Sequence, residues 1–112
     1  SYLQTQTDSM AVPVTVLPEA CYLLCNYLGQ EAERRFILSL LQGEMRVEGI
    51  TAEDLRQTSN LLHRYADANI GFVDATVVAI AERLKICQIL TTDRRHFSLI
   101  RPRHCKAFEL LP

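Results

Sequence analysis

Apolar side chains recur every three or four positions along much of this chain, which is the spacing of an amphipathic helix. Around Phe36, the apolar positions 36, 37, 40 and 41 fall on one helical face. Pro18 suits the first turn of a helix, and the glycines at positions 29 and 43 end the helices that precede them. The predicted helices are Glu19–Leu28, Glu31–Leu41, a helix capped by Thr51 that ends near Tyr65, and the strongly apolar Val73–Leu84.

Short β-branched or apolar runs separate these helices and predict strands. Cys87–Thr92 is apolar without alternation, which is typical of a strand that is buried on both faces of a parallel sheet. Strands that alternate with helices indicate an α/β fold with a small, largely parallel sheet flanked by helices, and 112 residues suffice for one domain. The predicted strands are Val12–Val16, Met45–Glu48, Cys87–Thr92 and Ala107–Leu111, and Ala66–Gly71 is predicted to be a loop.

Acidic residues stand at the ends of the predicted elements rather than on solvated helix faces. Glu19 opens a helix after a strand, and Asp67 lies in a loop. Asp74 begins a buried helix, and Asp93 follows the most apolar strand, where ligands of α/β sheets bind. Carboxylates that converge on one point repel each other unless a cation neutralises them, and hard oxygen ligands select Mg²⁺ or Mn²⁺. Together these residues predict a divalent-metal site.

Each of these carboxylates also has an ordinary structural explanation. Asp74 is a suitable helix N-cap, Glu19 favours the helix dipole, and Asp93 is a suitable turn residue. Taken one at a time, these explanations outweigh a metal role. The joint pattern of acidic residues at element ends is what favours the metal site.

Charge is distributed unevenly along the chain, although the net charge is only −1. Residues 1–82 carry five basic and eleven acidic side chains, whereas residues 83–112 carry seven basic and two acidic ones. A basic end of this kind either binds a phosphate backbone or is simply a solvated surface. The candidate phosphate-binding residues are Arg94, Arg95, Arg101 and Arg103.

The four cysteines favour a reducing compartment. Cys21 and Cys25 lie one helical turn apart, which permits a zinc pair, but no second pair has ligand spacing, so free thiols are the better interpretation. No apolar run is long enough to span a membrane, and Ser1–Met10 lacks a secretory signal. We therefore expect a cytoplasmic protein without a membrane partner.

Four motifs follow one another along the chain: Ala66–Ala75, with Asp67 and Asp74, then Ala79–Leu84, Ile89–Phe97, with Asp93, and the terminal Ala107–Pro112. In this order they resemble PIN-domain proteins, and more narrowly the VapC-type toxins of prokaryotic toxin–antitoxin pairs. In addition, Glu19 in a Pro-Glu-Ala motif is similar to the second acidic position of that family. The resemblance covers nearly all of residues 12–112.

The resemblance implies a three-layer PIN-like fold and a metal-dependent endoribonuclease. By similarity, Glu19, Asp74 and Asp93 hold Mg²⁺ or Mn²⁺ and direct an activated water to an RNA phosphodiester. Asp67 and Thr91 support that site, and the arginines of the basic end hold RNA phosphates. The resemblance also implies a cognate antitoxin as a protein partner, and a homodimer.

One feature of the family is missing from this sequence. Members begin with a strand that ends in an Asp, the first metal ligand, whereas Asp8 follows no apolar strand. We therefore expect an N-terminally truncated PIN-like domain that starts in the helix before the second family strand, with a complementing segment or a swapped partner in the gap. The alternative function is a non-catalytic RNA- or protein-binding module. A receiver or redox domain is disfavoured, because the sequence has no CxxC motif.

Overall fold

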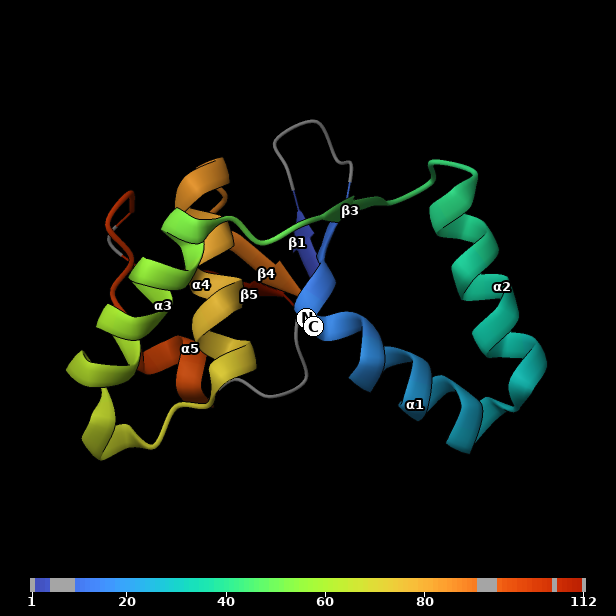
Figure 1. The fold of residues 1–112 in the computed structure, drawn as a ribbon, viewed down its shortest axis with the longest axis horizontal. Helices are drawn as coiled ribbons and strands as arrows, with labels where there is room; N and C mark the ends of the chain where they lie inside the picture. The colour runs from blue at the N-terminus through green and yellow to red at the C-terminus, as the bar shows by residue number, and fades with distance from the viewer. Residues whose placement is uncertain (1, 5–9, 91–94, 106, 112) are drawn as a thin grey trace.

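The fold is built around a five-stranded sheet with the strand order β3-β2-β1-β4-β5 (Figure 1). The computed structural model describes residues 2–4, 10–90, 95–105 and 107–111. Helices lie on both sides of the sheet, which confirms the predicted α/β class. The strands are β1 (Tyr2–Gln4), β2 (Met10–Pro13), β3 (Arg46–Glu48), β4 (Gln88–Leu90) and β5 (Glu109–Leu111).

Four of the five strands run in the same direction. β2 pairs with β3 and β4 pairs with β5 in parallel, whereas β1 is antiparallel to both of its neighbours, β2 and β4. Because β1 reverses the direction twice, β2 and β4 point the same way and their carboxyl ends share one edge of the sheet. The prediction of a largely parallel sheet is therefore confirmed, with one antiparallel strand at its centre.

The central strand comes from the N-terminal segment, for which the sequence predicted no strand. Leu3 is fully buried, and its Cα lies opposite Ala11 on one side and Ile89 on the other. The prediction that the chain starts in a helix is wrong for this segment. A three-residue strand in a polar context has no recognisable periodicity, and only its ladder to two neighbours defines it. Asp8 lies outside the described residues.

The helices α1 to α4 are close to those predicted, whereas α5 lies where the sequence predicted no helix. Two short 3₁₀ helices, η1 (Val14–Val16) and η2 (Ala66–Ala68), precede α1 and α4, and η2 lies inside the predicted loop. No helix among the described residues is both long and apolar enough to cross a membrane. The α-helices are α1 (Leu17–Leu28), α2 (Gln30–Leu41), α3 (Ala52–Arg64), α4 (Phe72–Leu84) and α5 (Arg95–Leu99).

Strand bounds differ more from prediction than helix bounds. The predicted strand Val12–Val16 is wrong in its second half, because β2 ends at Pro13 and Val14–Val16 forms η1. The β-branched residues there favour a strand locally, but Val16 instead packs into the core, so tertiary contacts override the local preference. β4 occupies Gln88–Leu90 of its predicted range, and Thr91 and Thr92 lie outside the described residues.

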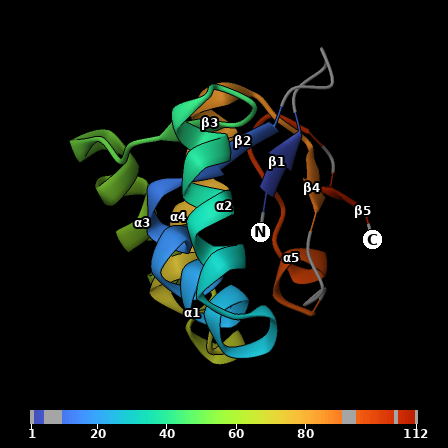
Figure 2. The same ribbon diagram turned by 90° about the vertical axis from the view of Figure 1, so that its right-hand side faces the viewer.

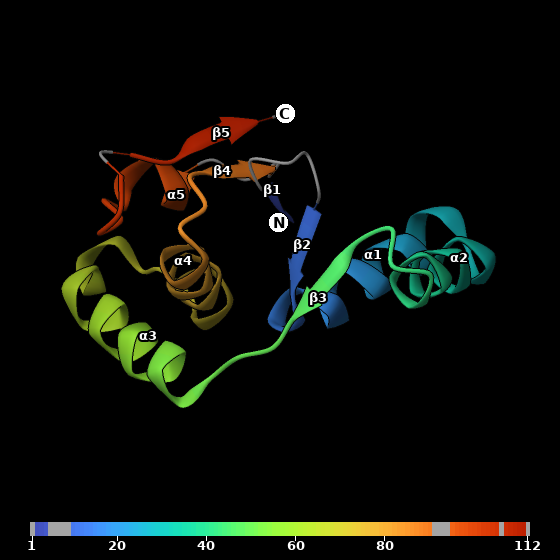
Figure 3. The same cartoon turned by 90° about the horizontal axis from the view of Figure 1, so that it is seen from above.

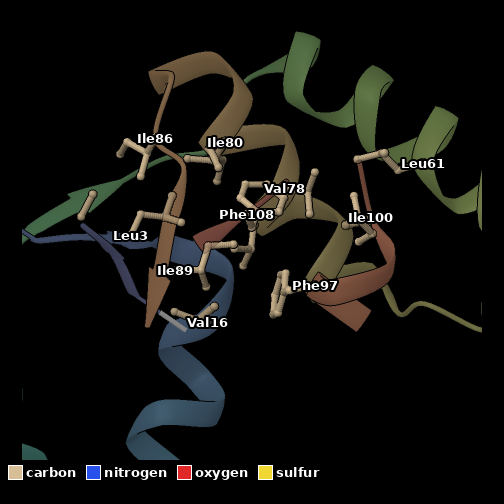
Figure 4. Packing of buried hydrophobic residues seen from close by; sticks show 14 of the residues in the cluster. Leu3, Val16, Leu61, Val78, Ile80, Ile86, Ile89, Phe97, Ile100 and Phe108 are labelled. Atoms are coloured by element: carbon tan, nitrogen blue, oxygen red, sulfur yellow. The ribbon is translucent and has the colours of Figure 1, made fainter. Parts of the chain in front are cut away.

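The hydrophobic core surrounds α4, which lies between α3 and the sheet (Figure 3). Eight consecutive residues of α4, from Ala75 to Glu82, are buried. Leu61 of α3, Phe97 of α5 and Ile89 of β4 reach the same core (Figure 4). By contrast, α1 and α2 form a helical hairpin that extends away from α3 and α4 (Figures 1 and 2). The core thus fixes the sheet and α4, and leaves the α1–α2 hairpin at the periphery.

Arg83 fastens the C-terminal end of α4 to the start of α3. Its Nε atom donates to both carboxylate oxygens of Asp54 at 3.1 Å, and its Nη2 donates to the Gly49 carbonyl at 3.0 Å. Asp54 is only 3% exposed and also closes the predicted cap of α3, because its carboxylate accepts from the Thr51 N–H while its own N–H donates to the Thr51 hydroxyl. This carboxylate therefore serves packing rather than chemistry.

Replacing Asp54 with asparagine is expected to lower the free energy of unfolding at neutral pH by about 2–4 kcal/mol, because a buried charged hydrogen-bond acceptor is lost. Burial by itself raises the pKa of Asp54, but the Thr51 N–H and the Arg83 guanidinium hold the pKa below its usual value. A carboxyl with a lowered folded-state pKa adds stability above its unfolded-state pKa, and this stability is lost as the pH falls through the folded-state pKa.

Urea unfolding at neutral and at successively lower pH tests this expectation. The free energies of wild type and variant are expected to converge in strong acid. The exposed neighbour Glu53 provides the matched control, since Glu53→Gln is expected to change the free energy of unfolding by less than about 0.5 kcal/mol. A difference between Asp54→Asn and wild type that stays constant at every pH would rule out a contribution from carboxylate ionisation.

Candidate functional site

The candidate site lies at the edge of the sheet where β2 and β4 end. β2 continues through η1 into α1, so Glu19 enters at this edge as the third residue of α1. Glu19 is exposed. The N-terminal end of a helix carries partial positive charge, which stabilises a carboxylate in the first turn. Glu19 is thus held near the sheet edge while it stays accessible to a ligand.

Asp74 is the third residue of α4 and is half-buried. Gly71 occupies the N-cap position of this helix, so the interpretation of Asp74 as the N-cap is wrong. Asp74 is followed by the fully buried Ala75 and Thr76. Its carboxylate therefore lies at the border between the apolar core and the surface.

A pair of threonines joins the helix of Glu19 to the helix of Asp74. The hydroxyls of Thr15 in η1 and Thr76 in α4 lie 2.7 Å apart. Since the Thr76 hydroxyl donates to the Val73 carbonyl at 2.6 Å, its oxygen accepts the proton of Thr15. Thr15 stands four residues before Glu19, and Thr76 two residues after Asp74. This hydrogen bond joins η1, just before the helix of Glu19, to the N-terminal half of the helix of Asp74, although Glu19 and Asp74 are 55 positions apart.

Sequence reasoning missed this threonine pair. The one available signal was a polar side chain at position 76 within an otherwise apolar helix, where a buried hydroxyl needs a hydrogen-bond partner. The partner, Thr15, is 61 residues away in the chain, so no local pattern identifies it.

Part of the predicted site lies outside the described residues. Thr91, Asp93 and Arg94 belong to that part, as does the side chain of Arg95, whose backbone begins α5. β4 ends at Leu90, three residues before Asp93 in the sequence, and its carboxyl end shares the edge with that of β2. The placement of Asp93 next to Glu19 and Asp74 stays a prediction.

Asp67 is exposed on η2, in the connection between α3 and α4. Within the described part of the chain, Glu19, Asp67 and Asp74 do not form a group whose ligand atoms all lie within 4.8 Å of one another. These three carboxylates by themselves therefore do not form a compact metal site. The donors that the edge does offer are carboxylate oxygens, which fit Mg²⁺ or Mn²⁺ and do not fit a soft cation.

The two described arginines of the basic end differ in their engagement. Arg101 is exposed, and its guanidinium donates to the Ser98 carbonyl at 2.8 Å. Arg103 has its Nε atom 3.5 Å from a carboxylate oxygen of Glu82. The phosphate-binding capacity of Arg103 is therefore reduced by an intramolecular ion pair, whereas Arg101 keeps most of its donors.

Glu82 is a buried carboxylate with a structural role. It accepts from the Gln57 side chain at 2.9 Å and from the Arg103 backbone N–H at 2.8 Å. It thereby ties α4 both to α3 and to the segment after α5. The Ala79–Leu84 motif combines small apolar residues with the charged pair Glu82 and Arg83. Its apolar residues pack in the core, and the two charged residues bind neighbouring segments.

Comparison with known proteins adds independent findings. Residues 2–101 match the family model described as PIN domain. The chain is 32% identical over 110 residues to Ribonuclease VapC26 of Mycobacterium tuberculosis (strain ATCC 25618 / H37Rv), covering 98% of this chain and 82% of that relative. The crystal structure of M. tuberculosis VapC20, described as a Sarcin-Ricin loop cleaving toxin, matches with a TM-score of 0.61 and 29% identity. That match covers 70% of this chain and 60% of the VapC20 chain.

Proposed function

Because this chain belongs to the PIN-domain family, we propose that it is a divalent-metal-dependent endoribonuclease of the VapC toxin type. The observation that carries the proposal is the match of residues 2–101 to the PIN domain. The Thr15–Thr76 hydrogen bond supports it, because it joins η1, which leads into the helix of Glu19, to the helix of Asp74. The names of the two relatives, a ribonuclease and an RNA-loop-cleaving toxin, support the same chemistry. The reaction takes place in the cytoplasm.

Glu19, Asp74 and Asp93 are the proposed ligands of Mg²⁺ or Mn²⁺, with Asp67 and Thr91 in supporting roles. A bound divalent ion would supply an activated water and neutralise charge that develops on the phosphodiester. The chain itself orients the carboxylates. Glu19 and Asp74 lie in the first turns of α1 and α4, where the helix N-terminus carries partial positive charge, and the threonine pair links η1 to α4.

The basic end of the chain is proposed to bind the RNA backbone. An exposed guanidinium binds a phosphate with two parallel hydrogen bonds, and such contacts add affinity without reading sequence. Arg101 is the better of the two described candidates, because Arg103 pairs with Glu82. Arg94 and Arg95 complete the proposed RNA-binding set.

A second candidate function is a non-catalytic RNA- or protein-binding module, and one observation favours it. Because β1 runs opposite to its neighbours, its residue at the site edge is Tyr2, paired with Leu90. The central strand therefore brings no carboxylate to this edge among the described residues. A site with fewer carboxylates binds a divalent cation more weakly.

The experiment that separates the two functions is cleavage of a labelled structured RNA by the 112-residue chain with Mn²⁺ and with excess chelator. If the chain is a nuclease, the wild type is expected to cleave the RNA only when Mn²⁺ is present, and the Asp74→Asn variant is expected not to cleave it. A folded chain that binds the RNA but does not cut it at any Mn²⁺ concentration would support the binding module.

The exposed face of the α1–α2 hairpin is proposed to join two copies of the chain. None of the twelve residues of α1, all of them described, is fully buried, although most are apolar. Such an apolar face on a soluble protein marks an interaction surface. A cognate antitoxin is the proposed second protein partner and would cover the site edge. The exposed apolar residues of the hairpin are Tyr22, Leu23, Tyr27, Leu28, Ile37, Leu38 and Leu41.

Replacing Tyr27 with aspartate is expected to weaken self-association at least about 10-fold, because a large, 80% exposed aromatic side chain at an interface centre contributes about 2 kcal/mol or more. Sedimentation equilibrium measures the dimer constant. Leu55→Asp on α3 is the matched control, since Leu55 is also exposed but lies away from the hairpin. Equal dimer constants for Tyr27→Asp and wild type would show that the exposed face of the α1–α2 hairpin is not the dimer interface.

A further inference from the structure

Three potential metal ligands with nitrogen and sulfur donors meet at one point of the structure. Cys87 directly precedes β4, and His104 and Cys105 lie in the segment between α5 and β5. One ligand atom from each lies within 4.8 Å of the others, and all three residues are half-buried. Among the described residues this is the sole group of three or more possible ligands at such spacing.

The imidazole of His104 has one ring nitrogen available for a metal ion. Its Nε2 atom lies 2.6 Å from the Ile86 carbonyl oxygen, which can only accept a hydrogen bond. Nε2 therefore carries the ring proton, and Nδ1 keeps its lone pair in the neutral ring. Nδ1 is buried and has no hydrogen-bond partner in the described structure. A ring N–H held by a backbone carbonyl, with the other nitrogen turned to a ligand, is the usual arrangement of metal-binding histidines.

The two cysteines add the remaining donors. Burial, with contributions from Cys87 and then Glu82, raises the pKa of the Cys105 thiol to about 12. Without a metal, this thiol is therefore protonated at neutral pH. A soft cation binds the thiolate and displaces the proton, so metal binding releases protons and strengthens as the pH rises.

We propose that Cys87, His104 and Cys105 bind one zinc ion. Two thiolates and an imidazole are ligands that zinc prefers, whereas Mg²⁺ and Mn²⁺ prefer oxygen. Ligand atoms around a tetrahedral zinc lie about 3.7 Å apart, so the cluster needs to contract only slightly around the ion. The three protein ligands leave one tetrahedral position for a water molecule.

The proposed zinc site lies at the end of β4 opposite to the candidate nuclease edge. Cys87 precedes the first residue of β4, whereas Asp93 follows its last residue. The Cys87 carbonyl also accepts from the Glu109 N–H at 2.7 Å, where β5 begins to pair with β4. A zinc ion would fasten the segment that carries His104 and Cys105 to β4 and thereby hold the edge strand β5 in register.

Cobalt binding to the 112-residue chain tests the proposal. Thiolate-bound Co²⁺ gives an intense near-ultraviolet charge-transfer band, which carboxylate-bound Co²⁺ does not. Wild type is expected to show this band with one Co²⁺ per chain, to lose it on addition of Zn²⁺, and to gain at least about 5 °C in Tm with Zn²⁺. Cys105→Ser is expected to lose the band, and the double variant Cys21→Ser, Cys25→Ser on α1 to keep it.

A second measurement remains decisive if Cys105→Ser does not fold. Zinc is expected to protect Cys87 and Cys105 of the wild type from alkylation, mapped by mass spectrometry, and to leave Cys21 and Cys25 reactive. Absence of the band in wild type, its persistence in folded Cys105→Ser, or a Cys87–Cys105 disulfide that excludes the metal would each overturn the proposal. Asp74→Asn is expected to keep the band, which separates this site from the proposed nuclease.

Discussion

Replacing Asp74 with asparagine is expected to reduce manganese-dependent RNA cleavage at least about 100-fold. The change removes one negative charge from the edge where Glu19 and Asp74 are joined through the Thr15–Thr76 hydrogen bond, and a metal ligand in such a site contributes several kcal/mol to the transition state. Asparagine keeps the size of the side chain at the third position of α4. The free energy of unfolding is expected to change by no more than about 1 kcal/mol, the value of a helix-dipole interaction.

Single-turnover cleavage of a labelled structured RNA, measured beside urea unfolding, gives both quantities. Glu53→Gln is the matched control, because it neutralises a first-turn carboxylate on α3 that has no place at the site edge. This control is expected to cleave at the wild-type rate. If a folded Asp74→Asn chain cleaves the RNA at the wild-type rate, Asp74 is not a metal ligand and the proposed mechanism is wrong.

Replacing Leu3 with alanine is expected to lower the free energy of unfolding by about 3 kcal/mol. Leu3 is 0% exposed at the centre of the sheet and packs in the same cluster as Ile89 and Val16 (Figure 4). Truncation of a buried leucine removes its transfer free energy and leaves a cavity that the surrounding structure fills only in part. Because β1 pairs with both β2 and β4, the loss weakens the junction of the two parallel strand pairs.

Equilibrium urea unfolding measures this effect, with Leu99→Ala as the control. Leu99 is 54% exposed in α5, so its truncation is expected to cost less than about 0.5 kcal/mol. An effect of Leu3→Ala as small as that of the control would mean that the N-terminal segment does not fill the central position of the sheet in solution.

Local patterns predicted most of the helices, because each of these helices depends on residues close together in the chain. Thr51 was predicted as the cap of α3, and its hydroxyl does accept from the Asp54 N–H at 3.0 Å. The apolar run at residues 73–84 predicted a buried helix, and α4 is the centre of the core. In both cases propensity, capping and burial all favour the same structure.

The sequence also placed Glu19 and Asp74 correctly at the starts of helices, although their functional roles stay predictions and Asp93 lies outside the described residues. Glu19 and Asp74 are each the third residue of a helix. The interpretation of Asp54 and Glu82 required the structure, because a buried carboxylate that pairs with Arg83 or Gln57 looks the same in sequence as a metal ligand. Only their partners distinguish the two cases.

Tertiary structure alone decided the features that join distant parts of the chain. β1 has no periodicity of its own and exists through its pairing with β2 and β4. The Thr15–Thr76 hydrogen bond spans 61 positions, and Cys87 stands 17 positions before His104, so neither is visible as a motif. The sequence by itself determined the helices, the class of fold and the candidate chemistry, because these follow from local spacing. The sheet centre and the group of Cys87, His104 and Cys105 arise only when folding brings distant residues together.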